Sequence, residues 1–426
     1  PALSTRIDFD GKYRGAAFAG AVLTSDLLTL QETGRSFPLR GHMTYGKTRI
    51  DADGMVADLL KRTTIDARVR ASGPSLAKLQ PFFDVHFVSH PYRADARLRK
   101  NDNNYAVEQL QAKIGATDIA GELSYRGDKD GAERDRPVLR ATLRSESADL
   151  ADLGVVDPPG AKEAGSERMF ASSALGAERI KAIDGHVSFI ARKLKSAAMP
   201  VLESLKFSAD LDDGILQLKP IDLGLAGGHA IGAITFDAQR EPASSQAALD
   251  FRGMRLDQLL PTLASKGVSP GSVSASLQLR GRGNSIAAIA GNASGSISMN
   301  MAGGRISNLL DAKLGLNLGK ILRLTISGDR AIDVHCAAIA FDFNNGLGKS
   351  RAILLDTEQT RIDGNGTMNL HDETLDVLLY PTQKNPGLFS LHSAFRVQGA
   401  LKHPVFALDK NAGPRTVADQ KHVQCP

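Results

Sequence analysis

The sequence is poor in residues that fill a dense core or crosslink a small one. Among its 426 residues none is Trp, aromatic side chains make up 5%, and only two are Cys. Two cysteines exclude a fold built on a network of disulfides. We expect Cys336, which lies in a predicted strand, to be a buried free thiol that packs as a small apolar side chain. A disulfide with Cys425 is the alternative.

Long apolar runs and a strong charge of one sign are also missing. The longest apolar stretch, residues 15–23, is far shorter than the ~20 residues of a helix that crosses a membrane. The 52 Lys and Arg residues exceed the 47 Asp and Glu residues by +5. This excess is spread along the chain and forms no concentrated basic face, so we expect no nucleic-acid partner.

The sequence contains none of the common catalytic or metal-binding motifs. It lacks a nucleophile elbow, a phosphate-binding loop, a dinucleotide-binding fingerprint and a zinc-protease motif. His86 and His90 have the spacing of metal ligands on a helix, but Pro91 follows at once and no third His or Cys lies nearby. We therefore expect no catalytic residue, no cofactor and no metal, and we expect that the protein is not an enzyme.

Alternation of apolar and polar residues dominates the sequence. Residues 205–211, 247–251, 272–279 and 296–301 are apolar at every second position. In a strand this pattern places the apolar side chains on one face and the polar ones on the other, as is typical of antiparallel sheets. We predict a mainly β protein: a long, twisted antiparallel meander that forms an elongated open groove or half-barrel. A few short amphipathic helices are expected at its ends or along one side.

Glycine is abundant, with 41 residues, and recurs in one short unit of Gly, any residue, apolar, small, apolar. The unit begins at Gly41, Gly121, Gly185, Gly232, Gly271, Gly295 and Gly366, the last with Asn at the small position, and a shortened copy begins at Gly399. We predict that these glycines lie at strand starts, where a turn, a bulge or a close approach of two backbones excludes a side chain.

Turns and helices are predicted between the strands. Asp-Gly and Asn-Gly pairs predict two-residue hairpin turns at 53–54, 184–185, 213–214, 345–346 and 363–364. Short helices are predicted near 166–181, 255–265 and 307–322, the last two from Leu at helical spacing.

Two β-rich segments and a tail are predicted from a break in the residue pattern and from the loss of periodicity near the end of the chain. A Pro-Pro-Gly break follows Asp157. We place an N-terminal β-rich segment at 1–156 and a second one, which holds the predicted helices, at 157–408. Residues 409–426 show no periodicity and are expected to be a loose tail.

A sheet of this length either buries its apolar face or leaves part of it open. One interpretation is a β-sandwich, or a sheet covered by helices. The other is a groove for an apolar ligand such as an acyl chain, which the adaptable side chains of Met299 and Met301 and the scarcity of aromatics favour. The pattern alone leaves both open.

Several short sequence motifs occur in the order in which a known family has them. They are residues 115–125 (GATDIAGELSY), 137–154 (PVLRATLRSESADLADLG), 223–228 (LGLAGG), 334–338 (VHCAA), 355–357, 364–366, 373–377 and 395–404 (FRVQGALKHP). In these motifs the chain resembles the AsmA family of Gram-negative bacteria, especially its C-terminal region. The resemblance covers most of the chain, although His335 and the stretch 155–200 depart from the family pattern.

The resemblance implies a protein of the periplasm, anchored to the inner membrane by an N-terminal helix that is not part of this chain. It also implies similarity to bridge-like lipid-transfer proteins, whose apolar β-groove carries phospholipid acyl chains. For this chain the implied role is phospholipid transfer between inner and outer membranes, which contributes to outer-membrane homeostasis. The alternatives are a non-enzymatic scaffold or assembly factor for outer-membrane proteins, or a hydrolase or lectin-like binder on a β-scaffold.

If a groove exists, we expect apolar positions of residues 232–236, 247–251, 272–279 and 296–301 to line it. These candidates are Ile234, Phe236, Leu249, Phe251, Leu277, Leu279, Ile297, Met299 and Met301.

Overall fold

The computed structural model describes residues 3–25, 36–58, 63–79, 88–127, 136–154, 168–197, 199, 201–259, 271–307, 331–384 and 394–409. The chain folds into two compact units. The first unit comprises residues 1–162 and 180–214, and the second comprises 163–179 and 215–426. The boundary predicted between residues 156 and 157 falls outside the described residues.

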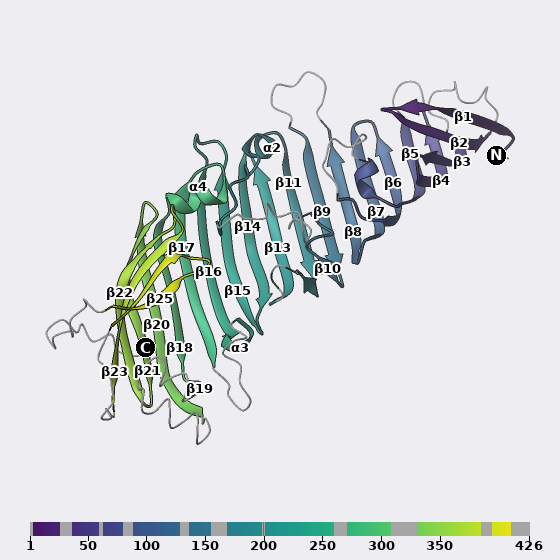
Figure 1. Ribbon diagram of the computed structural model, residues 1–426. Helices are drawn as coiled ribbons and strands as arrows, with labels where there is room; N and C mark the ends of the chain where they lie inside the picture. The colour runs from purple at the N-terminus through teal and green to yellow at the C-terminus, as the bar shows by residue number, and fades with distance from the viewer. Residues whose placement is uncertain are drawn as a thin grey trace. The chain divides into compact units, whose positions relative to one another are not determined.

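The first unit is an antiparallel meander with one parallel step (Figure 1). Its strands are β1 (Thr5–Tyr13), β2 (Ala16–Thr24), β3 (Ser36–Tyr45), β4 (Thr48–Ala57), β5 (Thr64–Gly73), β6 (Tyr92–Asn101), β7 (Asn104–Ile114), β8 (Thr117–Arg126), β9 (Val138–Ser145), β10 (Ala148–Asp149), β11 (Asp184–Ala191), β12 (Leu194–Lys195) and β13 (Leu202–Asp212). From β1 to β9 each strand pairs antiparallel with the next. Strand β9 then pairs in parallel with β11, and β11 pairs antiparallel with β13. Strands β10 and β12 form a separate parallel pair.

The second unit is antiparallel at every recorded pairing. Its strands are β14 (Ile215–Leu225), β15 (Gly228–Asp237), β16 (Ser244–Arg255), β17 (Ser272–Arg282), β18 (Ser294–Ala302), β19 (Arg305–Ser307), β20 (Ala331–Asn344), β21 (Leu347–Thr357), β22 (Thr360–Asn369), β23 (Thr374–Gln383), β24 (Ala394–Ala400) and β25 (Val405–Asp409). Neighbours in the chain are neighbours in the sheet, except that β18 and β19 both pair with β20.

The prediction of a mainly β protein built as an antiparallel meander is confirmed. The four alternating segments lie in β13, β16, β17 and β18. Among the described strands, β1 pairs only with β2, and β25 pairs only with β24. The meander therefore ends in an open edge at each of these strands.

Helices in the described residues are short: η2 (Leu76–Leu79), α2 (Ala177–Lys181), α3 (Leu256–Leu259) and α4 (Ile286–Gly291). The helix predicted near 166–181 is wrong over 168–176, because this stretch binds the backbone around α4. There Ala174 forms a β-bridge with Ser285, and the N–H of Ala287 donates to the carbonyl of Ala171. Helix α3 falls in the predicted 255–265, of which 260–265 lie outside the described residues, as do 308–322 of the third predicted helix. Helix α4 was not predicted.

Only some of the predicted hairpin turns exist. Asn345 and Gly346 have φ values of +47° and +78° and join β20 to β21, as predicted. The turns at 53–54, 184–185 and 363–364 are wrong, because these pairs lie within β4, β11 and β22. At 213–214 both φ values are positive, +47° and +76°, as a type I′ two-residue hairpin turn requires.

Glycines of the recurring unit were predicted at strand starts. Gly232 instead lies inside a strand, and what Gly232 and Gly295 share is a close approach of the neighbouring backbone. A Cβ on Gly232, inside β15, would lie 2.0 Å from the carbonyl oxygen of Ala248 on the next strand. A Cβ on Gly295 would lie 2.0 Å from the carbonyl oxygen of Gln278, and Gly295 also has a φ of +138°. Both glycines lie on the apolar face of their strand, so the missing side chain lets the sheet bend toward that face.

Cys336 is 1% exposed and disulfide-bonded, so the expectation of a free thiol is wrong. The only other cysteine of the sequence, Cys425, lies outside the described residues. A buried small apolar position in a strand suits a thiol and a disulfide equally, so the surrounding residues could not decide between them.

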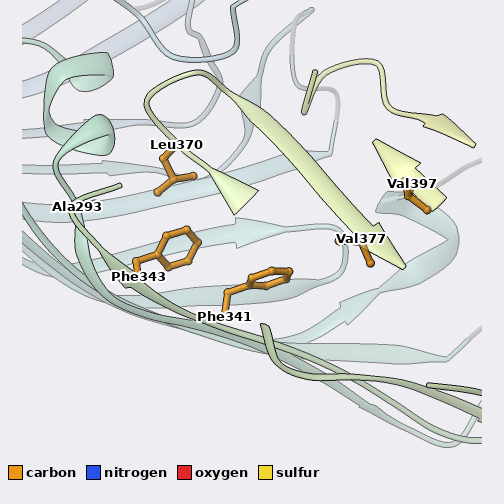
Figure 2. Close-up of a cluster of buried hydrophobic side chains, with 6 residues drawn as sticks. All are labelled: Ala293, Phe341, Phe343, Leu370, Val377 and Val397. Atoms are coloured by element: carbon orange, nitrogen blue, oxygen red, sulfur yellow. The ribbon is translucent and has the colours of Figure 1, made fainter. Parts of the chain in front are cut away.

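A buried cluster in the second unit joins strands that are not neighbours (Figure 2). Its members are Ala293, Phe341, Phe343, Leu370, Val377 and Val397. Phe341 and Phe343 come from β20 and project toward Leu370 and Val377, the latter on β23. Because β21 and β22 separate these two strands in the ladder, the sheet must curve back on itself to bring them together.

Candidate functional site

Strand register places all nine predicted lining residues on one face of the second unit. Leu249 lies opposite Leu277, and Leu277 lies opposite Ile297. Directly opposed residues of an antiparallel ladder project from the same face, as do alternate residues of one strand. The same relations connect the other six candidates: Ile234 and Phe236 in β15, Phe251 in β16, Leu279 in β17, and Met299 and Met301 in β18. We call this surface of β15–β18 the apolar face.

The apolar face is only partly covered. Phe236 and Met301 are buried, at 6% and 5% exposed. The other seven candidates are half-buried. Apolar side chains that retain partial exposure on neighbouring strands form a surface on which a further apolar group can pack.

Toward β20 the apolar face continues into the buried cluster. Ile297 lies opposite Phe341, and both Leu279 and Ile297 pack against the cluster. The face is thus half-open over β16–β18 and closed where β20 meets β23 and β24. The prediction did not include Phe341 and Phe343, although both alternate with Asp342 in the same way as the chosen residues.

A segment from the middle of the chain covers the buried cluster. Phe170 packs against the cluster, and its backbone N–H donates to the carboxylate of Glu373 at 3.4 Å. The same carboxylate accepts the N–H of Met169. Glu373 is 4% exposed, so its charge is held at a buried position by backbone donors. These contacts fix the stretch 168–175 over this end of the apolar face.

The first unit has the same two-faced construction. One face carries a row of apolar partners that runs from Leu98 through Val107 and Leu123 to Ala141. Further along, the rings of Phe189 and Phe207 lie 5.9 Å apart on opposed positions.

The opposite face of the first unit is a ladder of ion pairs. Arg40 bonds Asp53 at 2.9 Å. Both Arg68 and Arg70 bond Asp95, at 2.9 and 3.1 Å. These pairs join neighbouring strands, and they keep this face charged and hydrated.

Metal-binding geometry is not evident in the part of the chain that the structure describes. No group of three or more His, Cys, Asp or Glu residues there is arranged to hold a metal ion. His90 lies 3.5 Å from Asp152, whose carboxylate accepts the N–H groups of Ala116 and Thr117. This arrangement fixes a loop, while His86 lies outside the described residues. Helices long and apolar enough to cross a membrane are also missing from the described ranges.

The fold and this surface define a class of protein: each unit is a two-faced, largely antiparallel meander, and the apolar face of the second unit is partly open. The chain belongs to the AsmA family, whose family model matches residues 5–353. It is similar to the AsmA family protein YhjG of Escherichia coli strain K12, with 29% identity over 427 aligned residues. That match covers 95% of this chain and 61% of the relative, so the chain spans about three fifths of the length of the curated relative. No solved structure matches the chain.

Proposed function

We propose that the apolar face binds acyl chains of phospholipids and that the protein transfers them between the inner and outer membranes. The observation that carries this proposal is the register, which gathers the nine candidate lining residues of four strands on one partly open face. Membership in the AsmA family supports it. In this proposal the protein is not an enzyme, has no cofactor and works in the periplasm, anchored to the inner membrane. The disulfide at Cys336 supports an oxidising compartment.

Acyl chains suit this face because binding needs no specific chemistry. Each methylene group removed from water contributes about 0.8 kcal/mol. Similar apolar side chains recur on successive strands, from Leu249 through Leu277 to Ile297. In this proposal an acyl chain moves along these side chains between sites of comparable affinity, while the lipid headgroup stays in water.

The test is native mass spectrometry of the purified chain, with organic extraction and lipid analysis of the same sample. The variant Leu277→Asp with Met299→Asp puts two carboxylates on the apolar face, at diagonal positions of β17 and β18. Its control is Ser276→Asp with Asn300→Asp, the same diagonal on the other face. We expect phospholipid to co-purify with the wild type and the control and to be lost from the apolar-face variant, with all three equally folded.

An empty extract from the wild type would contradict the proposal, as would equal lipid in a folded Leu277→Asp, Met299→Asp variant. The non-enzymatic scaffold for outer-membrane proteins would then be the better interpretation. That role would depend on the open strand edges at β1 and β25, each of which pairs with one strand among those described.

A further inference from the structure

A hollow of about 860 Å³ lies on the polar face of the second unit, opposite the apolar face. Two rows of directly opposed side chains line it. The first row is Gln217, Thr235, Gln246, Arg280 and Ser294, one from each of β14 to β18, and the second is Asp237, Ser244 and Arg282. Asn292 and Asn345 complete one end. At about 4.8 Å between strands, the first row spans about 19 Å.

Arg280 and Arg282 differ from the other arginines that the structure describes from residue 215 onward. Seven arginines described from residue 215 onward have an Asp carboxylate within 4.0 Å: Arg240, Arg252, Arg255, Arg305, Arg351, Arg361 and Arg396. Among the described residues, neither Arg280 nor Arg282 has an ion-pair or hydrogen-bond partner for its guanidinium. The two arginines of this stretch that lack a partner among the described residues therefore lie side by side in one hollow.

The two guanidinium groups are placed to hold one anion between them. Arg280 and Arg282 are alternate residues of β17, so they project from the same face about 7 Å apart at the backbone. A planar guanidinium bonds phosphate or carboxylate through two parallel N–H donors. Asp237, the acid in the hollow, is already bonded to Arg240 at 2.9 Å and leaves both of these arginines uncompensated.

The remaining lining suits hydroxyl groups. Gln217 and Gln246 each offer an amide donor and an acceptor, and Ser244 offers a hydroxyl. Asn292 offers its amide oxygen, because its amide nitrogen already donates to the carbonyls of Arg282 and Ala288. Such side chains can bond both the hydrogen and the oxygen of a ligand hydroxyl. A ligand that matches the whole hollow therefore has several hydroxyls and one anionic group.

We propose that this hollow binds a phosphate-bearing polyol, with the phosphate on Arg280 and Arg282 and the hydroxyls along the amide and hydroxyl side chains. Two sources share this chemistry: a soluble sugar phosphate and the glycerol phosphate headgroup of an anionic lipid. The proposal does not depend on acyl-chain binding, because the hollow lies on the other face of the sheet.

The experiment titrates the whole chain with glucose 6-phosphate by calorimetry at low salt, with glucose and inorganic phosphate as partial probes. A second arm measures co-sedimentation with vesicles of phosphatidylglycerol or of phosphatidylcholine. The test variant is Arg280→Ala with Arg282→Ala. The control, Arg252→Ala with Arg351→Ala, removes the same charge from outside the hollow, where both arginines have Asp partners.

We expect the test variant to bind at least tenfold more weakly than the control, and the complete probe to bind more tightly than glucose or phosphate alone. Binding of glucose 6-phosphate without vesicles identifies a soluble ligand. Binding of phosphatidylglycerol vesicles without glucose 6-phosphate identifies a headgroup, and either result supports the site. Absence of saturable binding to both probes would overturn the proposal, as would an equal loss in the two variants. Lipid extraction of the Leu277→Asp, Met299→Asp variant tests the acyl-chain proposal separately. Failure of the hollow to bind its probes would therefore leave that proposal standing, and the reverse also holds.

Discussion

Arg97 donates two hydrogen bonds of 2.7 Å, one to each carboxylate oxygen of Asp66 on the neighbouring strand. This bidentate pair is one of several cross-strand ion pairs on the polar face of the first unit. Since both side chains are more than a third exposed, solvent screens much of its energy.

Stability should depend on pH through this pair. The hydrogen bond from Arg97 lowers the pKa of Asp66 below its usual value. A lowered carboxyl pKa contributes stability that is present above the unfolded pKa, near 3.9, and is lost as the pH falls through the folded pKa. We expect Asp66→Asn to melt slightly below the wild type at pH 7, and the gap to close below about pH 4. A gap that stays constant from pH 7 to pH 2 in thermal melts would refute this assignment.

Packing on the inner side of the curved sheet should matter more than apolar character alone. Phe341 is 5% exposed inside the cluster, and Ile339, two residues earlier on the same face of β20, is 37% exposed. We expect Phe341→Ala to lower the free energy of unfolding by about 3–5 kcal/mol. The matched change Ile339→Ala should cost much less. Urea unfolding measures both, and equal losses would mean that the cluster is not packed as described.

The alternation of residues was sufficient to predict which side chains share a face. Leu277 and Leu279 could be assigned to one side of a strand because the period of a strand is two, whichever strand lies beside it. That Leu277 faces Ile297, and Ile297 faces Phe341, depends on register, which is set by contacts between distant residues. The face could therefore be predicted, but its closed end could not.

The predictions that failed did so where a distant partner overrides a local signal. Asp53 and Gly54 resemble a hairpin turn, but Asp53 pairs with Arg40 on the preceding strand, β3, and stays in the ladder. Residues 168–176 lack a helix because Ala171 and Ala174 bond backbone more than a hundred residues away. The hollow on the polar face was missed for the same reason, since Arg280 and Arg282 stand out only once the partners of the other arginines are known.

The stability cost of the close backbone approach at Gly295 should be measurable separately from the cost of its positive φ. Gly295 combines a φ of +138° with a neighbouring carbonyl 2.0 Å from where a Cβ would lie. Gly303 also has a positive φ, +75°, but nothing lies within 4 Å of its Cβ position. We expect Gly303→Ala to cost the conformational strain of about 1–3 kcal/mol. Gly295→Ala should cost clearly more, because β17 and β18 must also move apart. Chemical denaturation of both variants decides this, and similar costs would exclude a steric role for Gly295.

The cover over the buried cluster should depend on one buried carboxylate. Glu373 accepts the backbone N–H groups of Met169 and Phe170, and hydrogen bonds to charged groups contribute about 1.5–3 kcal/mol. We expect Glu373→Ala to release the stretch 168–175, so that the amides of Met169 and Phe170 exchange hydrogen faster. The adjacent Asp372, which is exposed and bonds Asn369, supplies the control Asp372→Ala. Hydrogen exchange followed by mass spectrometry should find faster exchange only in the Glu373 variant. Unchanged protection of Met169 and Phe170 would show that packing of Phe170 alone holds the cover.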